Sequence, residues 1–173
     1  MFERCSDPIR RAIFYARAVA TLNGSPAIDS VHLLFGLMWG SDSRAHELFH
    51  LRETFPLYHG CPWKFASLEA APQRDPQLTD VAKQILVRTQ WEADAARDYW
   101  IDTEHLLLGI LGEKTCLAAQ HLTSAGLTLK SARRLVAENK ASRPDYGPVS
   151  PWWGLQSPFE RLLFKWRSRK YES

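Results

Sequence analysis

Apolar residues recur at helical spacing through most of the first 140 residues. The first such series follows Asp7-Pro8 and consists of Ile9, Ala12, Ile13, Ala16 and Ala20. This spacing predicts a helix with one buried face. Asp7 followed by Pro8 is typical of a helix start, with a capping side chain before a proline at the first helical position. No segment shows sustained strand alternation, so the sequence predicts an all-α fold with negligible sheet content.

The same pattern returns 73 residues further along the chain. Residues 28–37 and 101–110 read almost alike, and Ser6-Asp7 corresponds to Thr79-Asp80 at the same offset. The second copy of the first helix carries its apolar face on Ala82, Ile85, Leu86, Thr89 and Ala93. We therefore predict one duplicated domain over residues 1–140, with repeat one at about 1–70 and repeat two at about 77–140. The copies should be related by a pseudo-twofold axis, because each unit buries its apolar face against the other.

Each repeat should contain four helices. The second helix opens at Asp29-Ser30 and at Asp102-Thr103, where side chains can cap it. The third lies near 44–51 and 117–125, and Thr128 caps a fourth in repeat two. Prolines and a glycine interrupt the fourth helix of repeat one; residues 63–68 could be its displaced remnant, and residues 71–76 read as the linker between repeats.

Charge is unevenly distributed along the chain, whose formal net charge is +3. Residues 157–173 hold five basic and two acidic side chains, which leaves the rest of the chain without net charge. This argues against a nucleic-acid-binding domain, because such a domain usually carries a basic face. The start of the chain has no apolar signal segment, and no long apolar run occurs, so we expect a cytoplasmic location. The three cysteines are too few for a disulfide framework and are expected to be reduced.

The motif residues resemble those of a known family. Residues 2–7, an alanine-rich helix and residues 29–37 are similar to the N-terminal domain of Clp-type AAA+ unfoldases, whose duplicated motif usually reads T-E-H-L-L-x-G-L. Residues 103–110 match that motif almost letter for letter. The resemblance covers about residues 1–140 and implies a domain that recognises proteins for an unfoldase–protease system.

We expect a stand-alone recognition module, because the sequence has no G-x-x-x-x-G-K-[ST] loop for a nucleotide. Residues 112–115 come near it, but a glutamate stands where the loop needs a glycine. No catalytic constellation occurs, so we predict a protein that is not an enzyme and needs no cofactor. Its partner would be a Clp unfoldase, an adaptor or a substrate. The alternative is a protein-interaction or membrane-surface-associated protein that keeps this fold without a Clp role.

Thr103 and Glu104 are the candidate ligand-binding residues. By resemblance, the motif glutamate pairs with the guanidinium of phosphoarginine on a partner protein, while nearby hydroxyl and backbone groups take the phosphate. Repeat one has Val31 at the equivalent position, so at most one such site is expected. The alternative role of Glu104 is structural, because a carboxylate in the first turn of a helix is favoured by the helix dipole.

Histidines are the other candidate ligands. His32 and His105 have no second ligand at helical spacing, so we interpret them as hydrogen-bonded core residues. His46 and His50, with His59 and Cys61 downstream, could form a zinc site, but helix surfaces supply such pairs by chance and we predict no metal.

The end of the chain forms a separate pattern. Residues 141–156 read as a linker rich in proline, glycine and tryptophan, and residues 157–173 as a basic amphipathic helix. Its apolar face carries Phe159, Leu162, Leu163 and Trp166. Such a face could fold back on the domain, dock on a partner or insert at an anionic membrane surface.

Overall fold

The computed structural model describes residues 2–39, 43–51 and 76–140. The predicted remnant at 63–68, the linker at 141–156 and the tail helix at 157–173 lie outside the described residues. Domain boundaries that depend on these segments stay predictions.

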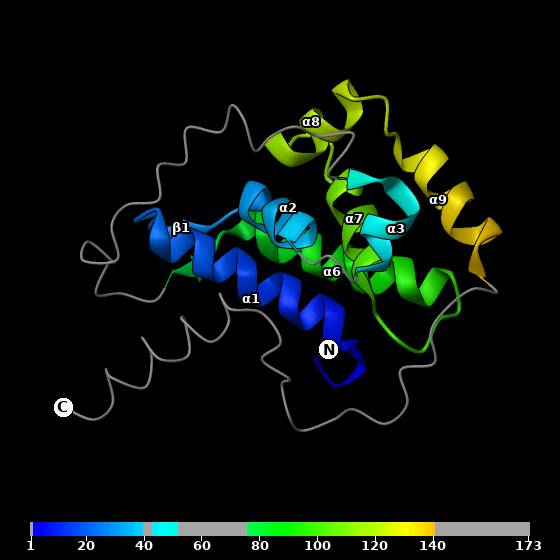
Figure 1. The fold of residues 1–173 in the computed structure, drawn as a ribbon, viewed down its shortest axis with the longest axis horizontal. Coiled ribbons are helices and arrows are strands. Elements are labelled where there is room, and N and C mark those ends of the chain that lie inside the picture. Colours follow the sequence, from blue (N-terminus) through cyan, green and yellow to red (C-terminus); the bar gives the residue numbers. More distant parts are fainter. Residues whose placement is uncertain (1, 40–42, 52–75, 141–173) are drawn as a thin grey trace.

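Repeat one contains the short 3-10 helix η1 (Phe2–Arg4) and the helices α1 (Asp7–Leu22), α2 (Ser30–Trp39) and α3 (Arg44–Phe49). Repeat two contains α6 (Asp80–Ala95), α7 (Thr103–Gly112), α8 (Leu117–Ser124) and α9 (Leu129–Glu138) (Figure 1). The predicted all-α, duplicated fold is therefore confirmed for these elements. Two short strands, β1 (Ala27–Ile28) and β2 (Gln77–Leu78), were not predicted, because two residues are too few to show alternation.

The start of α1 differs from the prediction by one residue. Ser6, rather than Asp7, is the N-cap, and Asp7 is already helical. The Ser6 hydroxyl does not cap the helix but donates to Asp102 Oδ1, at 2.8 Å, in the other repeat. At the equivalent place Thr79 caps α6 in the ordinary way, accepting the Ala82 N–H at 3.1 Å.

In each repeat, the segment before the first long helix pairs with the segment before the second helix of the other repeat. β1 and β2 pair in parallel, with Ile28 opposite Leu78, and a single bridge joins Cys5 to Ile101. At the repeat offset, Cys5 corresponds to Leu78 and Ile28 to Ile101, so these are the same contact made twice. The Ser6 N–H donates to the Ile101 carbonyl and the Thr79 N–H to the Ile28 carbonyl, each at 2.9 Å. Each repeat therefore completes its partner, as a pseudo-twofold domain requires.

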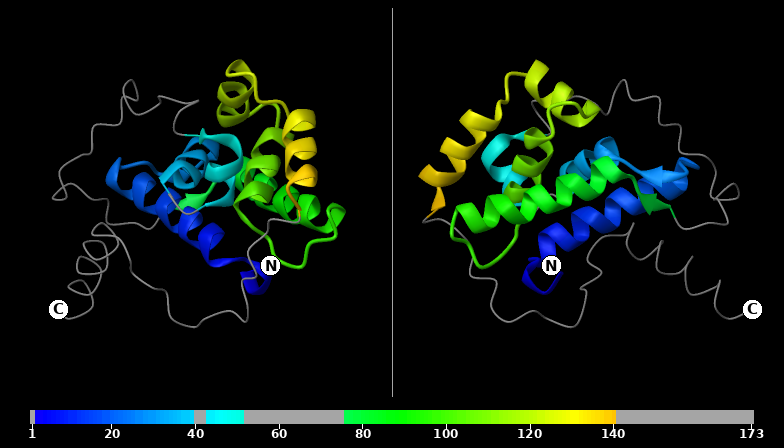
Figure 2. Two further views of the ribbon diagram at one scale, coloured as in Figure 1. Left: turned by 45° about the vertical axis from the view of Figure 1, so that its right-hand side comes forward. Right: turned by 180° about the vertical axis from the view of Figure 1, so that it is seen from behind.

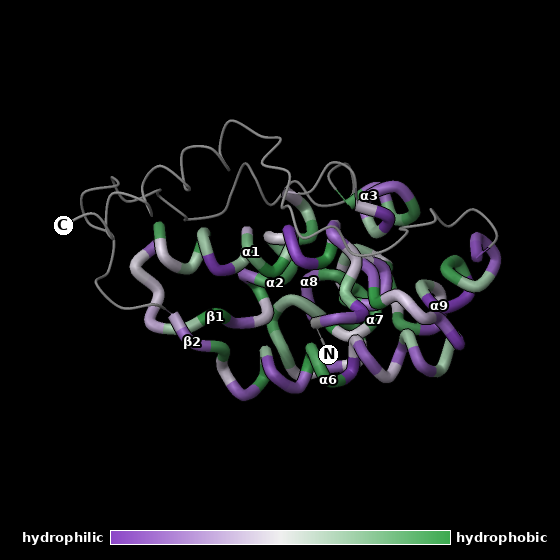
Figure 3. Tube along the Cα trace, turned by 90° about the horizontal axis from the view of Figure 1, so that it is seen from below, coloured by the Kyte–Doolittle hydropathy of each residue, from purple (hydrophilic) through white to green (hydrophobic). Residues whose placement is uncertain are grey.

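Close helix crossings at equivalent glycines hold each helix pair together. A Cβ at Gly36 of α2 would lie 2.0 Å from the Ala12 carbonyl oxygen of α1, and one at Gly109 of α7 would lie 2.8 Å from the Ile85 carbonyl oxygen of α6. Only glycine permits this approach. Leu33, Leu37, Leu106 and Leu107 of α2 and α7 are fully buried in the core. The long helices α1 and α6 alternate between hydrophobic and hydrophilic positions along their length (Figure 3).

Candidate functional site

Thr103 and Glu104 lie at the start of α7, beneath α3. Asp102 caps this helix together with the His105 side chain in a capping box. Both candidate side chains are fully buried. The Thr103 hydroxyl accepts the Ala45 N–H of α3 at 3.0 Å. The two predicted site residues thus come together, but they lie in the contact between repeats rather than on the surface.

Glu104 forms an ion pair with Arg44 of repeat one. Arg44 Nε lies 3.2 Å from Glu104 Oε1, and the two side chains are 2% and 0% exposed. The Arg44 Nη2 group also donates to the Asn139 carbonyl at the C-terminal end of α9, where the helix dipole favours a cation. The carboxylate that the resemblance assigns to a ligand guanidinium is therefore paired with a guanidinium of this chain. Arg44 was not among the site residues predicted from the sequence, where its only signal is a basic residue directly before Ala45.

The equivalent end of the domain lacks both charges. At the repeat offset Glu104 corresponds to Val31, and Arg44 corresponds to Leu117. Leu117 is 58% exposed at the start of α8. The symmetry-related position, with Val31 of repeat one and Leu117 of repeat two, lacks both the carboxylate and the guanidinium. The Arg44–Glu104 pair is therefore one unit that breaks the symmetry of the domain.

The motif histidines make core hydrogen bonds. His105 Nδ1 accepts the Asp102 N–H at 3.0 Å, which places the proton on Nε2, 3.1 Å from Asp98 Oδ2. Lys140 Nζ lies 3.1 Å from the other oxygen of Asp98. His32 Nδ1 lies 3.1 Å from the Asp29 backbone nitrogen and 2.8 Å from Asp29 Oδ1. The network around His105 ties the end of α9 to the loop between α6 and α7.

The sequence also contains candidate metal ligands and a near match to a nucleotide-binding loop. Among residues 2–39, 43–51 and 76–140, no three His, Cys, Asp or Glu side chains converge on a possible metal position. His46 lies in α3 and His50 caps its end, whereas His59 and Cys61 lie outside the described residues.

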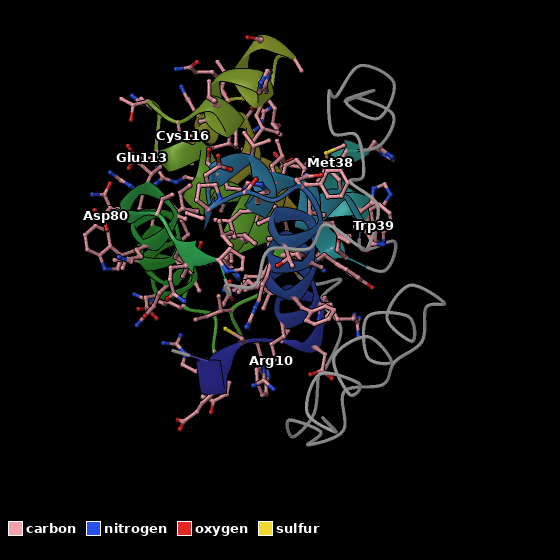
Figure 4. All side chains as sticks on the ribbon, turned by 90° about the vertical axis from the view of Figure 1, so that its left-hand side faces the viewer. Arg10, Met38, Trp39, Asp80, Glu113 and Cys116 are labelled. Atoms are coloured by element: carbon pink, nitrogen blue, oxygen red, sulfur yellow. The ribbon has the colours of Figure 1, made fainter. Side chains whose placement is uncertain are left out.

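The turn at 112–115 is closed by Glu113, whose carboxylate accepts the Thr115 hydroxyl at 2.9 Å. Figure 4 places Glu113 and Cys116 toward one side of the domain and Met38 and Trp39 toward the other.

A groove of about 720 Å³ runs between α6 and α9. Figure 2 shows α9 beside the C-terminal half of α6. The groove is lined by Arg88, Trp91 and Glu92 of α6, Leu108 of α7, and Arg133 and Val136 of α9, among others. Trp91 is 65% exposed. The groove was not predicted from the sequence, because only packing brings α6 and α9 together.

Three ion pairs border the groove and share one arrangement. Glu92 accepts from Arg133 Nε and Nη2 at 3.0 and 2.6 Å, and these hydrogen bonds raise the pKa of Arg133 above its ordinary value. Arg88 Nε lies 3.2 Å from Glu113, and Lys140 pairs with Asp98. In each pair the cation is about half exposed and the carboxylate is largely buried. The groove therefore presents cations and an indole ring to solvent.

A helix that spans a bilayer needs about 20 consecutive, mostly apolar residues. Within the part of the chain that the structure describes, no helix is long and apolar enough to cross a bilayer. The apolar tail residues Phe159, Leu162, Leu163 and Trp166 lie outside that part.

Solved structures share this fold. The chain is similar to the N-terminal domain of the chaperone ClpD from Arabidopsis thaliana, with a TM-score of 0.59, 19% identity and coverage of 83% of this chain and 97% of that one. It is also similar to the Hsp104 N-terminal domain from Candida albicans, with a TM-score of 0.61, 15% identity and coverage of 82% and 94%. At these identities the likeness shows the fold.

Proteins of similar sequence are also Clp proteins. The ClpA homolog of Cyanidium caldarium, an ATP-binding subunit of the ATP-dependent Clp protease, is 46% identical over 57 residues, which is 33% of this chain and 7% of that protein. The chaperone protein ClpB of Oceanobacillus iheyensis is 27% identical over 139 residues, 80% of this chain and 17% of that protein. The chain thus spans less than a fifth of these curated relatives. Residues 77–162 match the family described as the Clp repeat (R) N-terminal domain. With the duplicated helical fold, this match shows the sequence of a Clp repeat N-terminal domain over residues 77–162.

Proposed function

We propose that this protein is a non-catalytic recognition domain for Clp-dependent regulated proteolysis, binding an unfoldase component, an adaptor or a substrate. The observation that carries the proposal is the match of residues 77–162 to the Clp repeat, set in a double-repeat fold. An open groove with an exposed indole and exposed cations supports protein binding, because aromatic and arginine side chains are enriched in protein interfaces.

Phosphoarginine recognition at Thr103 and Glu104 is a finer part of this proposal. Because Arg44 is paired with Glu104, a ligand guanidinium has to displace the Arg44 guanidinium before it can reach the carboxylate. Binding would therefore move α3. Calorimetric titration of the full chain with phosphoarginine should give one site at most, abolished by Glu104→Gln. Two equivalent sites, or binding that Glu104→Gln leaves unchanged, would contradict this role.

Direct binding to purified Clp ATPases tests the proposed function. The full chain is immobilised, and ClpA-type and ClpB-type ATPases from the same source are passed over it in a biosensor, with and without a nucleotide. We expect saturable binding to one of them and a changed rate of degradation or disaggregation of a model substrate. An unrelated helical protein of similar size and net charge is the control. Absence of binding and of any effect on either ATPase would contradict a Clp role.

A further inference from the structure

We propose that the groove between α6 and α9 binds a peptide segment of a partner protein in which an apolar side chain is flanked by carboxylates. This inference rests on the proposed recognition function and names the docking surface and the chemistry of the partner.

The apolar part of the groove provides an anchor site. Leu108 and Val136 are buried beneath it, and the Trp91 indole lies at its edge. At the repeat offset Trp91 corresponds to the buried Ala18 of α1, so the repeat architecture does not require a large exposed ring at this position. An exposed indole beside an apolar floor is the arrangement found at the centre of protein interfaces, where a partner side chain covers the ring.

The charged side chains beside the apolar part of the groove determine which sign of charge the partner should carry. Glu92, Asp98 and Glu113 are largely buried and hold their cations in place, while Arg88, Arg133 and Lys140 reach solvent. A guanidinium has five N–H donors, and Glu92 is bound through only two nitrogens of Arg133. Carboxylates of a partner would therefore meet fixed cations that need little reordering, which reduces the entropic cost of binding.

The tail of this chain is the other conceivable occupant, and its charge argues against it. Lys140, which lines the groove, is the last described residue before the C-terminal segment. Residues 157–173, however, carry five basic and two acidic side chains, the same sign as the exposed cations. Like charges brought together at an interface oppose binding, so an acidic segment of another protein fits better.

Fluorescence anisotropy with a labelled peptide tests the proposal on the full chain. The probe is a twelve-residue peptide with two phenylalanines among six glutamates, and two control peptides replace the glutamates by lysines or the phenylalanines by serines. We expect the acidic apolar probe to bind at least about tenfold more tightly than either control, with affinity falling as salt rises. Equal binding of the charge-reversed peptide would overturn the proposal.

Matched variants locate the site. Trp91→Ala and Arg133→Ala should each weaken probe binding by about tenfold, the size expected for an interface anchor. Val87→Ala on α6 and Arg134→Ala on α9 make the same kinds of change at exposed positions outside the groove lining and should leave affinity unchanged. Far-UV circular dichroism and thermal unfolding verify that every variant is folded. If the groove variants bind as well as the wild type, the proposal fails.

Two further measurements separate the remaining outcomes. A synthetic peptide of residues 157–173 is added as a competitor; displacement of the probe by this peptide, dependent on Trp91, would show that the tail is the occupant and overturn the proposal. The same variants are tested against the Clp ATPases in the biosensor. If an ATPase binds wild type and Trp91→Ala equally and the probe does not bind, the recognition function holds while the groove proposal fails.

Discussion

At the scale of single residues, the buried Arg44–Glu104 pair is the most consequential contact. Removing two charges from water costs several kcal/mol for each ion, and their mutual attraction offsets that cost only while both are present. Arg44 joins α3 to α7 and, through the Asn139 carbonyl, to the end of α9. The pair therefore connects repeat one to two helices of repeat two.

The first prediction is that the pair acts as a unit. Arg44→Leu should lower the free energy of unfolding by about 3–5 kcal/mol, because it leaves the Glu104 carboxylate buried and unpaired. The double change Arg44→Leu with Glu104→Val introduces the residues that Leu117 and Val31 supply at the other end of the domain, and it should recover most of that loss. Urea unfolding followed by far-UV circular dichroism measures the wild type, Arg44→Leu, Glu104→Val and the double variant. Additive effects of the two changes would contradict the prediction.

The second prediction concerns the acid side of the stability profile. The His32 ring, 2.8 Å from Asp29 Oδ1, and the N–H groups of Val31 and His32 hold the pKa of Asp29 below its ordinary value. A lowered folded-state pKa stabilises the fold above the unfolded value of about 3.9, and this contribution is lost as the pH falls through the folded value. Asp29→Asn should therefore reduce stability near neutral pH and flatten its fall below about pH 4.

Carbon-detected NMR titration of the Asp29 carboxyl group gives an independent measurement of that pKa. A midpoint at or above the value in an unfolded peptide would refute the explanation, whatever the variant does to stability.

At the scale of elements, the two long helices end in the same way but with different residues. Gly24 and Arg97 follow the C-caps of α1 and α6, and both adopt left-handed backbone, with φ of 66° and 56°. Their neighbours close equivalent hydrogen bonds, from Ser25 N–H to the Ala20 carbonyl and from Asp98 N–H to the Ala93 carbonyl, each at 2.9 Å. Left-handed backbone suits glycine and is unfavourable for a residue with a Cβ.

The third prediction follows from this difference. Arg97→Gly should raise the free energy of unfolding by about 1 kcal/mol, and Gly24→Ala should lower it by a similar amount. The second change is a clean test of backbone strain, because a Cβ at Gly24 would meet no atom within 4 Å. Thermal and urea unfolding provide the values. Two changes with the same sign would show that contacts other than backbone strain decide this position.

At the scale of the whole molecule, neither repeat is complete alone. The segment before α6 pairs with Ile28 of repeat one, the segment before α1 pairs with Ile101 of repeat two, and Glu104 depends on Arg44. Arg4 adds to this exchange through hydrogen bonds to the carbonyl oxygens of Asp98 and Tyr99 at 3.0 and 2.9 Å.

The fourth prediction is that separated repeats do not fold as monomers. Residues 77–140 alone should show little cooperative thermal unfolding, because their apolar faces and strand partners are missing. Mixing them with residues 1–76 should restore helical signal and cooperativity in a one-to-one complex, measured by circular dichroism and light scattering. A monomeric 77–140 fragment with a sharp unfolding transition would contradict the interdependence of the repeats.

The sequence by itself determined the helices and the duplication, since both depend on local chemistry. Apolar spacing locates the buried faces, and caps such as Asp102 and Thr128 define the helix starts. Gly126, with φ of 88°, takes the left-handed position after α8 for the same local reason. The predicted start of α1 was one residue too late, because Ser6 and Asp7 both suit an N-cap. Ser6 takes this position while its hydroxyl donates to Asp102 of the other repeat.

Only the tertiary structure decided which residues meet across the domain. Glu104 could be recognised as a first-turn carboxylate, but its partner Arg44 lies on another helix of the other repeat, and no local spacing connects them. The pairing of β1 with β2 and the groove between α6 and α9 likewise join segments that are distant in the sequence. Side-chain periodicity reports which face of a helix is buried, whereas the partner against which that face is buried depends on packing between distant segments.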